Sequence, residues 1–382
     1  MLRIEIAVED AAAGQTRWDA IEFSIPADFH AHNDAVAAAL MTLVGTTYQA
    51  VSFNFPISSS CAETLQAAYP GVVVGPADPS LEPRRPGQRI GLSFSGGLDS
   101  TGALALLRAL EVEPAVITSA YEHFDFEARG YSHHHRDITC HTNLRCHRLD
   151  RSGRFNSAVP LLHADYLGLG MVTTGHTVNL SGDCLLLPGE VERPTFLQSD
   201  LVVNAAGLQE LHLVRSLHNH GLSRLLMYLA PQWIEIGLSG THRPTSEKYY
   251  TKAWIFTYLY RQAGLPLPGF LAQLVWPRRS IPFGLDIGMD LRMLHMAKHA
   301  DFHQVRRICP DLGSYDLTFL RDIELRFLER YHPTIAALLP QDLRPKVLDL
   351  FEAAGILPYD AHDWQEIAAV RAFLASIDAH YL

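Results

Sequence analysis

The sequence predicts an α/β protein with a parallel sheet covered by helices on both faces, a small N-terminal α/β region and a helical C-terminal region. Three observations support this. Between residues 88 and 264, short apolar runs alternate with longer amphipathic ones, as strands and helices do in a parallel sheet. Small or polar residues follow each predicted strand, where ligands approach such sheets. The 382 residues suffice for two or three domains.

The first region, residues 1–87, is predicted to be a small α/β domain. Its strands are expected at 1–8, 48–55 and 72–74, and its helices at 34–43 and 61–69. Four prolines between residues 75 and 88 predict a linker to the next domain. Nothing in this region indicates a function.

The second region, residues 88–264, is predicted to hold the parallel sheet. Strands are expected at 90–94, 115–119, 138–142 and 171–174, and helices at 99–110, 155–167 and 208–218. The third region, residues 265–382, is predicted to be mostly helical, because apolar residues recur at helical spacing over 317–331 and 364–374. Its arginine pairs at 278–279 and 306–307, together with Arg292 and Lys298, are either a solvated face or a contact to substrate phosphate or tRNA.

Bulk properties favour a soluble cytoplasmic enzyme. The net charge of −10 argues against a protein that coats nucleic acid, although a local basic groove stays open. Five cysteines without C-x-x-C spacing are typical of a reduced protein. The N-terminus alternates like a strand, and no apolar run reaches the roughly 20 residues of a membrane helix.

The most informative stretch is residues 90–101, IGLSFSGGLDST. A glycine pair between a strand and a helix lets backbone N–H groups approach an anion, and the helix dipole favours negative charge there. Asp99 can hold Mg²⁺ against phosphate oxygens. The pattern is neither a Walker loop nor a dinucleotide fingerprint. We interpret it as a pyrophosphate-binding cradle made by Ser93, Ser95, Gly96, Gly97, Leu98, Asp99, Ser100 and Thr101.

SGGLDST resembles the SGGxDS[ST] signature of the PP-loop ATP pyrophosphatases, which have an adenine nucleotide alpha hydrolase-like (HUP-like) fold. The resemblance implies that ATP binds with its pyrophosphate on the loop and Mg²⁺ near Asp99, and is cleaved between its α- and β-phosphates. It also implies that adenine lies against the end of the second strand, at Thr118, Ser119 and Ala120. The resemblance is specific over the loop and weaker across residues 88–264.

Residues 173–183, TTGHTVNLSGD, are similar to the second motif of N-type PP-loop enzymes. Gly175 and His176 match its Gly-His, which implies contact with the nucleotide; a histidine in an ordinary capped turn is the alternative. The acids of the usual GHxxDD pattern are displaced, because Asn179 is nearer the expected position and Asp183 comes later. Whether Asp183 is a second Mg²⁺ ligand is therefore left open by the sequence.

Residues 237–264 are similar to the segment after the core of 7-cyano-7-deazaguanine synthase-like proteins. They lack the cysteines of that family's zinc knuckle, so we expect no zinc there. Lys248 and Lys252 are predicted to stabilise the pyrophosphate or the charge on the α-phosphate, and Arg243 to contact substrate. Ordinary exposed cations on a helix are the alternative.

Polar residues after the third strand, His141, Asn143 and Arg145, are predicted to line the substrate pocket. The His- and Cys-rich stretch 133–147 leaves a transition-metal site open, although neighbours on a strand point to opposite faces. Cys184 is interpreted as a buried packing residue, with a sulfur-carrying nucleophile as the alternative.

These features predict an ATP- and Mg²⁺-dependent ligase-type enzyme. A carboxylate or amide-like oxygen of a small-molecule substrate is adenylated, pyrophosphate leaves, and a nitrogen nucleophile displaces AMP. One alternative is a sulfur transferase of the same fold that acts on tRNA or a small molecule. Another is a non-catalytic nucleotide-binding or sensing protein. A nucleobase substrate and a homodimer also stay open.

Overall fold

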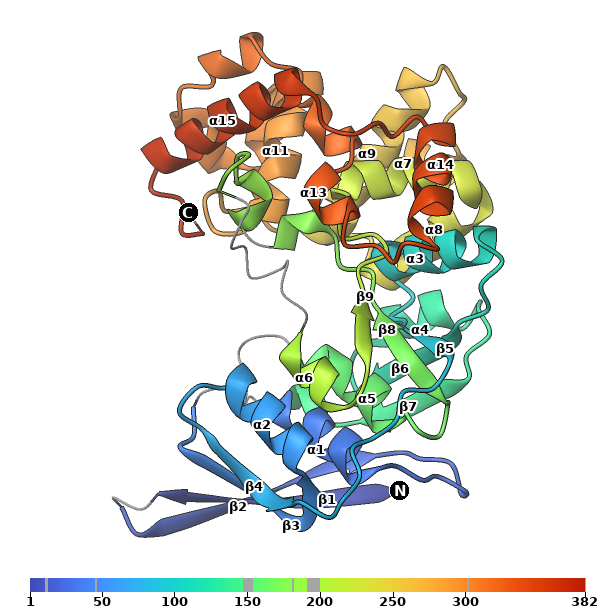
Figure 1. Ribbon diagram of the computed structural model, residues 1–382. Helices are drawn as coiled ribbons and strands as arrows, with labels where there is room; N and C mark the ends of the chain where they lie inside the picture. The colour runs from blue at the N-terminus through green and yellow to red at the C-terminus, as the bar shows by residue number, and fades with distance from the viewer. Residues whose placement is uncertain are drawn as a thin grey trace. The chain divides into compact units, whose positions relative to one another are not determined.

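The computed structural model contains a seven-stranded, mostly parallel sheet flanked by helices, and its C-terminal part is helical (Figure 1). The structure describes residues 1–10, 13–44, 47–146, 154–180, 182–190, 200–300 and 302–381, with the backbone alone at 146, 154, 155, 180, 182 and 183. The strands of the large sheet are β1 Leu2–Asp10, β2 Gln15–Phe23, β5 Arg89–Ser93, β6 Ala115–Tyr121, β7 Ile138–Thr142, β8 Leu169–Thr173 and β9 Gln209–Leu211.

The order of strands in this sheet is β1-β2-β7-β6-β5-β8-β9. From β5 the chain moves outward through β6 to β7, then returns to the other side of β5 with β8 and β9, and all of these strands are parallel. The order therefore reverses between β5 and β8. In open α/β sheets, ligands bind beyond the carboxyl ends of the strands at such a reversal.

The predicted strands of residues 88–264 are confirmed as β5, β6, β7 and β8. The predicted helix at 208–218 is wrong, because Gln209–Leu211 form the edge strand β9 and the helix α7 begins only at Asn219. The apolar residues of this segment have helical spacing, but the backbone pairs with β8 instead. The helix predicted at 155–167 is shorter, with α5 covering Ala158–Leu162.

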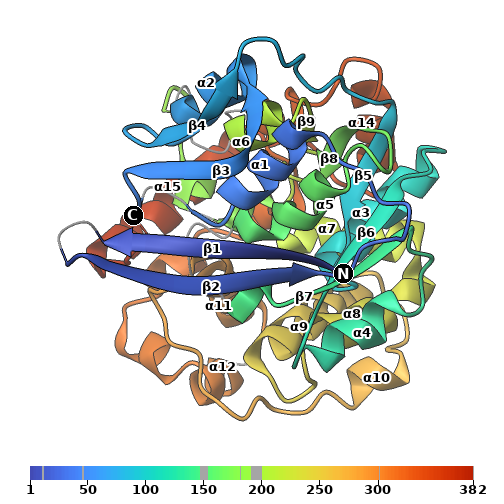
Figure 2. The ribbon, with the colours of Figure 1, turned by 90° about the horizontal axis from the view of Figure 1, so that it is seen from below.

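The N-terminal strands belong to two sheets. Figure 2 shows β1 and β2 side by side as a long antiparallel hairpin, and Phe23 of β2 pairs with Thr142 of β7. No strand is predicted for β2, so this connection to the large sheet is a finding of the structure. The predicted strands at 48–55 and 72–74 are confirmed as β3 (Ala50–Ser58) and β4 (Val73–Asp78), which form a separate parallel pair.

The chain packs into two compact units, which we call the sheet unit and the helical unit. The sheet unit comprises Met1–Ser95, Glu113–Thr173 and Ser199–Leu211, and the helical unit comprises Gly96–Val112, Thr174–Gln198 and His212–Leu382. This division differs from the predicted boundaries after residues 87 and 264. The N-terminal hairpin joins the large sheet, and the segments that follow β5, β8 and β9 pack with the C-terminal helices.

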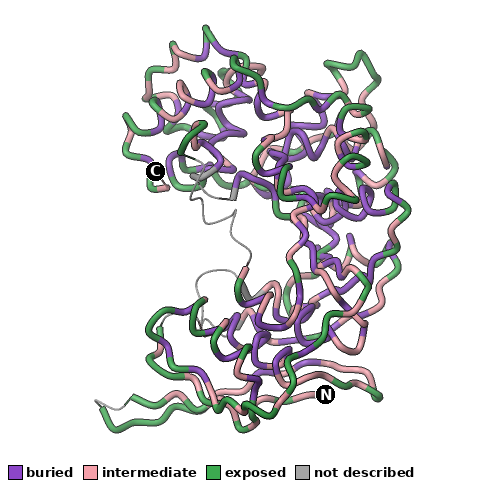
Figure 3. Tube along the Cα trace, viewed as in Figure 1, coloured by how far each residue is buried: buried purple, intermediate pink, exposed green. Residues whose placement is uncertain are grey.

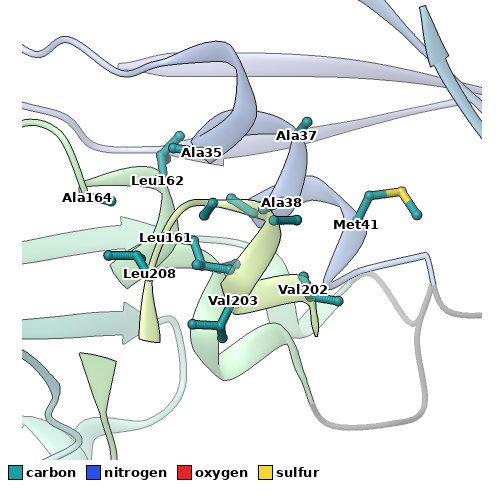
Figure 4. Close-up of a cluster of buried hydrophobic side chains, with 14 of the residues drawn as sticks. Ala35, Ala37, Ala38, Met41, Leu161, Leu162, Ala164, Val202, Val203 and Leu208 are labelled. Carbon is teal, nitrogen blue, oxygen red and sulfur yellow. The ribbon is translucent and has the colours of Figure 1, made fainter. Parts of the chain in front are cut away.

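Helices α1, α5 and α6 pack on one another in the sheet unit through small and branched apolar side chains (Figure 4). Ala35 and Ala38 of α1, Leu161 of α5 and Val203 of α6 are all buried in this core. The helices of the sheet unit are α1 Asn33–Met41, α2 Ser59–Ala68, α4 Asp125–Tyr131, α5 Ala158–Leu162 and α6 Leu201–Ala205. The predicted helices at 34–43 and 61–69 are thus confirmed.

The helical unit has its own apolar interior, and Figure 3 shows buried residues throughout its helices. Its helices are α3 Leu98–Ala109, α7 Asn219–Leu229, α8 Ile234–Thr241, α9 Glu247–Gln262, α10 Gly269–Ala272, α11 Ile287–His299, α12 Phe302–Ile308, α13 Pro333–Ala336, α14 Arg344–Ala353 and α15 Ala361–Ser376. The helical character predicted for residues 265–382 is confirmed, although residues 317–331 form short 3₁₀ turns. None of the helices in the described ranges has both the length and the apolar character that a membrane span requires.

Candidate functional site

The chain enters α3 through two glycines. Gly96 has a φ of +76°, a left-handed conformation that glycine adopts without a side-chain clash. Gly97 is the extended N-cap residue and provides no side-chain cap. The Leu98 N–H donates to Thr241 Oγ1 of α8 at 3.1 Å, which anchors the first turn. The positive end of this 12-residue helix therefore lies at Asp99, its second residue.

Asp99 forms an ion pair with Lys252 of α9, whose Nζ lies 2.6 Å from both carboxylate oxygens. The lysine side chain is 5% exposed and the aspartate side chain 36%, so solvent reaches the carboxylate. Burial raises the pKa of Asp99, but Lys252, Lys248 and Arg292 more than offset this, and the pKa lies below its ordinary value. Burial lowers the pKa of Lys252 to about 8 despite the attraction of Asp99. Both groups are therefore ionised at neutral pH.

A buried chain of hydrogen bonds orients the carboxylate of Asp99. Asn219 Nδ2 donates to Asp99 Oδ1 at 3.3 Å, and Asn179 Nδ2 donates to Asn219 Oδ1 at 2.8 Å. The Thr177 hydroxyl donates to Asn179 Oδ1 at 2.7 Å. Thr177, Asn179 and Asn219 are all buried, so these bonds replace water for their polar groups.

The members of this chain come from segments that follow three neighbouring strands. Asp99 follows β5, Thr177 and Asn179 follow β8, and Asn219 follows β9. Each segment enters the helical unit after its strand ends, and the hydrogen bonds between them lie within that unit. The parallel order of the strands thus brings together residues that are 120 positions apart in sequence.

Three cations act on Asp99. Lys252 forms the ion pair with it described above. Lys248 lies one turn earlier on α9 and is exposed, whereas Arg292 of α11 is buried. Asp286 and Asp290 also act on Arg292, so its charge is partly compensated. The N–H groups of the α3 N-terminus, with Lys252 and Lys248 beside them, are suited to bind an anion.

Gly175 allows the segment after β8 to pack against the first turn of α3. A Cβ at this position would lie 2.4 Å from the carbonyl carbon of Asp99 and from the nitrogen of Ser100. Any larger residue would therefore displace the helix start. The neighbouring His176 is exposed, and its N–H donates to Thr174 Oγ1 at 3.2 Å.

The residues predicted to bind adenine belong to the sheet unit. The Thr118 hydroxyl is buried and donates to the carbonyl oxygen of Phe94 at 2.8 Å, which ties β6 to the residue after β5. Ser119 is half-buried, and Ala120 is buried. Ser93, the last residue of β5, donates through its hydroxyl to the Asn156 carbonyl oxygen at 3.3 Å.

Two of the residues predicted to contact substrate make structural contacts in the sheet unit. Asn143 bridges to β2, accepting from the Glu22 N–H at 3.0 Å and donating to the Ala20 carbonyl oxygen at 3.1 Å. Arg145 pairs with Glu127 at 3.1 Å. By contrast, His141 of the sheet unit and Arg243 of the helical unit have exposed side chains.

The metal predictions rest partly on residues outside the described set. The side chain of Asp183 lies outside the described residues, as do the side chain of Cys146 and all of His147. Among the residues that the structure does describe, no three histidine, cysteine or acidic side chains lie together as metal ligands. Asp99 is thus the one predicted metal ligand whose surroundings are known.

The described cysteines are buried thiols. Cys61, Cys140, Cys184 and Cys309 are each at most 2% exposed. Burial raises the pKa of Cys140 and that of Cys309 to about 12, so neither forms a thiolate at neutral pH. The complete burial of Cys184 favours the predicted packing role over a sulfur-carrying nucleophile.

Asn219 and Thr177 are residues of this site that sequence reasoning missed, and Arg292 was predicted only as one member of a basic region. Neutral amides and hydroxyls have no distinctive spacing, and Arg292 lies far outside the resembling segment. Asn219 had one usable signal, its place shortly after a strand of the parallel sheet. The erroneous helix at 208–218 concealed that strand.

Comparison with known proteins adds no assignment, because no family model, curated protein or solved structure matches the chain.

Proposed function

We propose that this protein is a PP-loop ATP pyrophosphatase with a HUP-like sheet, which transfers AMP from ATP to an oxygen of a small-molecule acid and releases pyrophosphate. A nitrogen nucleophile then displaces AMP, so the overall reaction is a ligation. The observation that carries this proposal is the α3 N-terminus. There, a partly exposed carboxylate is held by a buried lysine at 2.6 Å, and Lys248 and Arg292 also act on it.

In this proposal the cationic groups bind phosphate oxygens, and the neutral amide side chains position Asp99. The α3 N-terminus and the ammonium groups of Lys252 and Lys248 would bind the pyrophosphate oxygens and stabilise the charge that develops as pyrophosphate leaves. Positioning and charge stabilisation account for most catalysis in such transfers, so no covalent protein nucleophile is needed. The Asn179–Asn219 bonds keep Asp99 in place while Lys252 turns toward the ligand.

The residues present fit a Mg²⁺ ion that arrives with the nucleotide. Magnesium is usually bound through one or two carboxylates together with substrate phosphates, and Asp99 is a partly exposed carboxylate. When bound, Mg²⁺ would neutralise phosphate charge. Asp99 would hold it.

The sheet topology supports a nucleotide as ligand. The loop before α3 follows β5, which borders the reversal of strand order with β8. Nucleotides commonly bind at such a position in α/β proteins. The four cysteines whose side chains the structure describes are buried, which supports a sulfur transferase less well than a ligase, because a thiol that carries sulfur must be accessible.

The test is an assay of the full chain with ATP, Mg²⁺, ammonium and a panel of carboxylic acids. We expect AMP and pyrophosphate in equal amounts with at least one acid. ATP with a methylene group between its α- and β-phosphorus atoms is the control and should yield no AMP. Release of ADP alone would contradict the proposal, whereas nucleotide binding without any release would identify a sensor.

A further inference from the structure

Arg292 is a buried cation without an anionic partner. It is 7% exposed, on the first half of α11. Among the described residues, no carboxylate forms an ion pair with its guanidinium; Asp286, Asp99 and Asp290 act on it only from a greater distance. Buried charges in proteins are normally paired, because an isolated charge loses its hydration without compensation.

The guanidinium is held in a fixed orientation. Its Nε donates to the Gly288 carbonyl oxygen at 2.7 Å and its Nη1 to Thr251 Oγ1 at 3.1 Å. Its Nη2 has no hydrogen-bond partner among the described residues, yet solvent reaches this atom. An arginine fixed on two nitrogens and open at the third is prepared to bind an oxygen anion.

Contacts link this arginine to Asp99 from two directions. On one side, Thr251 precedes Lys252 on α9, and Lys252 is bonded to Asp99. On the other side, Gly288 packs on Asn179 so closely that a Cβ would lie 2.8 Å from the amide nitrogen.

Asn179 continues this second connection. It donates to Asn219, which donates to Asp99. These contacts form a closed ring that connects Arg292 with Asp99 through α3, α7, α9 and α11.

We propose that Arg292 is an anion-binding residue of the α3 site, which contacts an oxygen of the pyrophosphate group of the ligand. This inference rests on the proposed function and adds to it a binding residue from the C-terminal helices. It also explains why a guanidinium is buried there without a carboxylate, since the ligand supplies the missing negative charge. A purely structural arginine joining α9 to α11 is the competing explanation.

The experiment is calorimetric titration of the full chain with inorganic pyrophosphate, with and without Mg²⁺. Arg292→Gln keeps donors but loses the charge, Arg292→Lys keeps the charge but loses the fork, and Thr251→Val removes the acceptor that orients Nη1. Arg261→Gln is the matched control, because it removes an exposed arginine of the same unit, in the last turn of α9. Thermal unfolding of each ligand-free variant is measured in parallel.

We expect Arg292→Gln to weaken pyrophosphate binding by about 10- to 100-fold, as loss of a charged hydrogen bond does. Arg292→Lys and Thr251→Val should weaken it less, and Arg261→Gln less than twofold. Unchanged affinity in all the Arg292 and Thr251 variants, with or without lower thermal stability, overturns the inference and leaves the proposed function standing. If the wild-type chain binds neither pyrophosphate nor ATP, the proposed function itself fails.

Discussion

Each unit contains a buried arginine, and the two arginines differ in whether an acidic side chain pairs with them. In the sheet unit, Arg84 Nε donates to Asp165 at 2.8 Å, and its Nη groups donate to the carbonyl oxygens of Ala206 and Leu169 at 3.1 and 2.9 Å. In the helical unit, Arg292 has two hydrogen bonds and no ion pair among the described residues. Both arginines are more than nine-tenths buried.

We interpret this difference as one between a charge that stabilises the fold and charges that bind a ligand. Arg84 is neutralised and hydrogen-bonded by its own unit, so its removal should affect stability. Lys252, Lys248 and Arg292 act on Asp99 at the proposed binding site, so their removal should affect binding. The predictions below test this contrast, beginning with the largest expected effect.

Replacement of Asp99 by alanine should lower the rate of pyrophosphate release by about 10³-fold, because the carboxylate that orients the phosphates and Mg²⁺ is lost. The fold should persist, since the Asp99 side chain is partly exposed. Measurement combines the release assay with circular dichroism. Undiminished turnover in the folded variant would exclude the mechanism.

Arg84→Met should lower the free energy of unfolding by about 3–5 kcal/mol, because Asp165 loses its buried partner. Arg292→Met should leave it unchanged or raise it, since an unpaired buried charge is removed. Urea denaturation of the two variants provides the comparison. Equal losses of stability would show that Arg292 is as structural as Arg84.

Gly175→Ala should destabilise the protein by roughly 1–3 kcal/mol, since its Cβ meets the backbone of Asp99 and Ser100 at 2.4 Å. Pyrophosphate affinity should fall as well, because the α3 N-terminus must shift. Gly269→Ala in α10 is the matched control, since no atom lies within 4 Å of a Cβ there. Identical behaviour of the two variants would rule out a close approach at Gly175.

Acidification should destabilise the helical unit. Burial lowers the pKa of His218 to about 3 and that of His332 to about 4, and it also lowers the pKa values of His220 and His295. Below pH 6.5 the unfolded chain therefore binds more protons than the folded chain. The free energy of unfolding should fall by up to about 1.4 kcal/mol per pH unit for each such histidine.

Hydrogen exchange at pH 7 and pH 5.5 measures this effect in each unit. Peptides from α7 and α11, which carry His220 and His295, should lose more protection at pH 5.5 than peptides from β6. Replacement of the exposed His141 by glutamine is the control and should not alter the difference. Equal loss of protection in both units would contradict the prediction.

Cys184→Ser should have the smallest effect, with pyrophosphate release close to that of the unchanged protein. The side chain is fully buried, and a ligase needs no thiol. The same pyrophosphate-release assay measures the activity of this variant. Loss of activity in a stable variant would instead favour sulfur transfer.

Local sequence patterns determined much of the architecture. The strand at 138–142 has the predicted bounds, and α3 begins one residue before its predicted start, because strand alternation and a glycine-paired loop are local signals. Asp99, Lys252 and Gly175 were predicted as site residues and lie together in the helical unit. Their roles in binding stay predictions.

Only the tertiary structure decided what local signals do not encode. The segment at 209–211 is a strand because β8 offers it an open edge, not because of its own pattern. Asn219 and Arg292 join the site because the chain returns to α3 from distant positions, and an amide or an arginine looks the same in any sequence until its neighbours are known. The physical reason is that hydrogen bonding and charge compensation depend on distance in space, whereas a sequence shows distance along the chain.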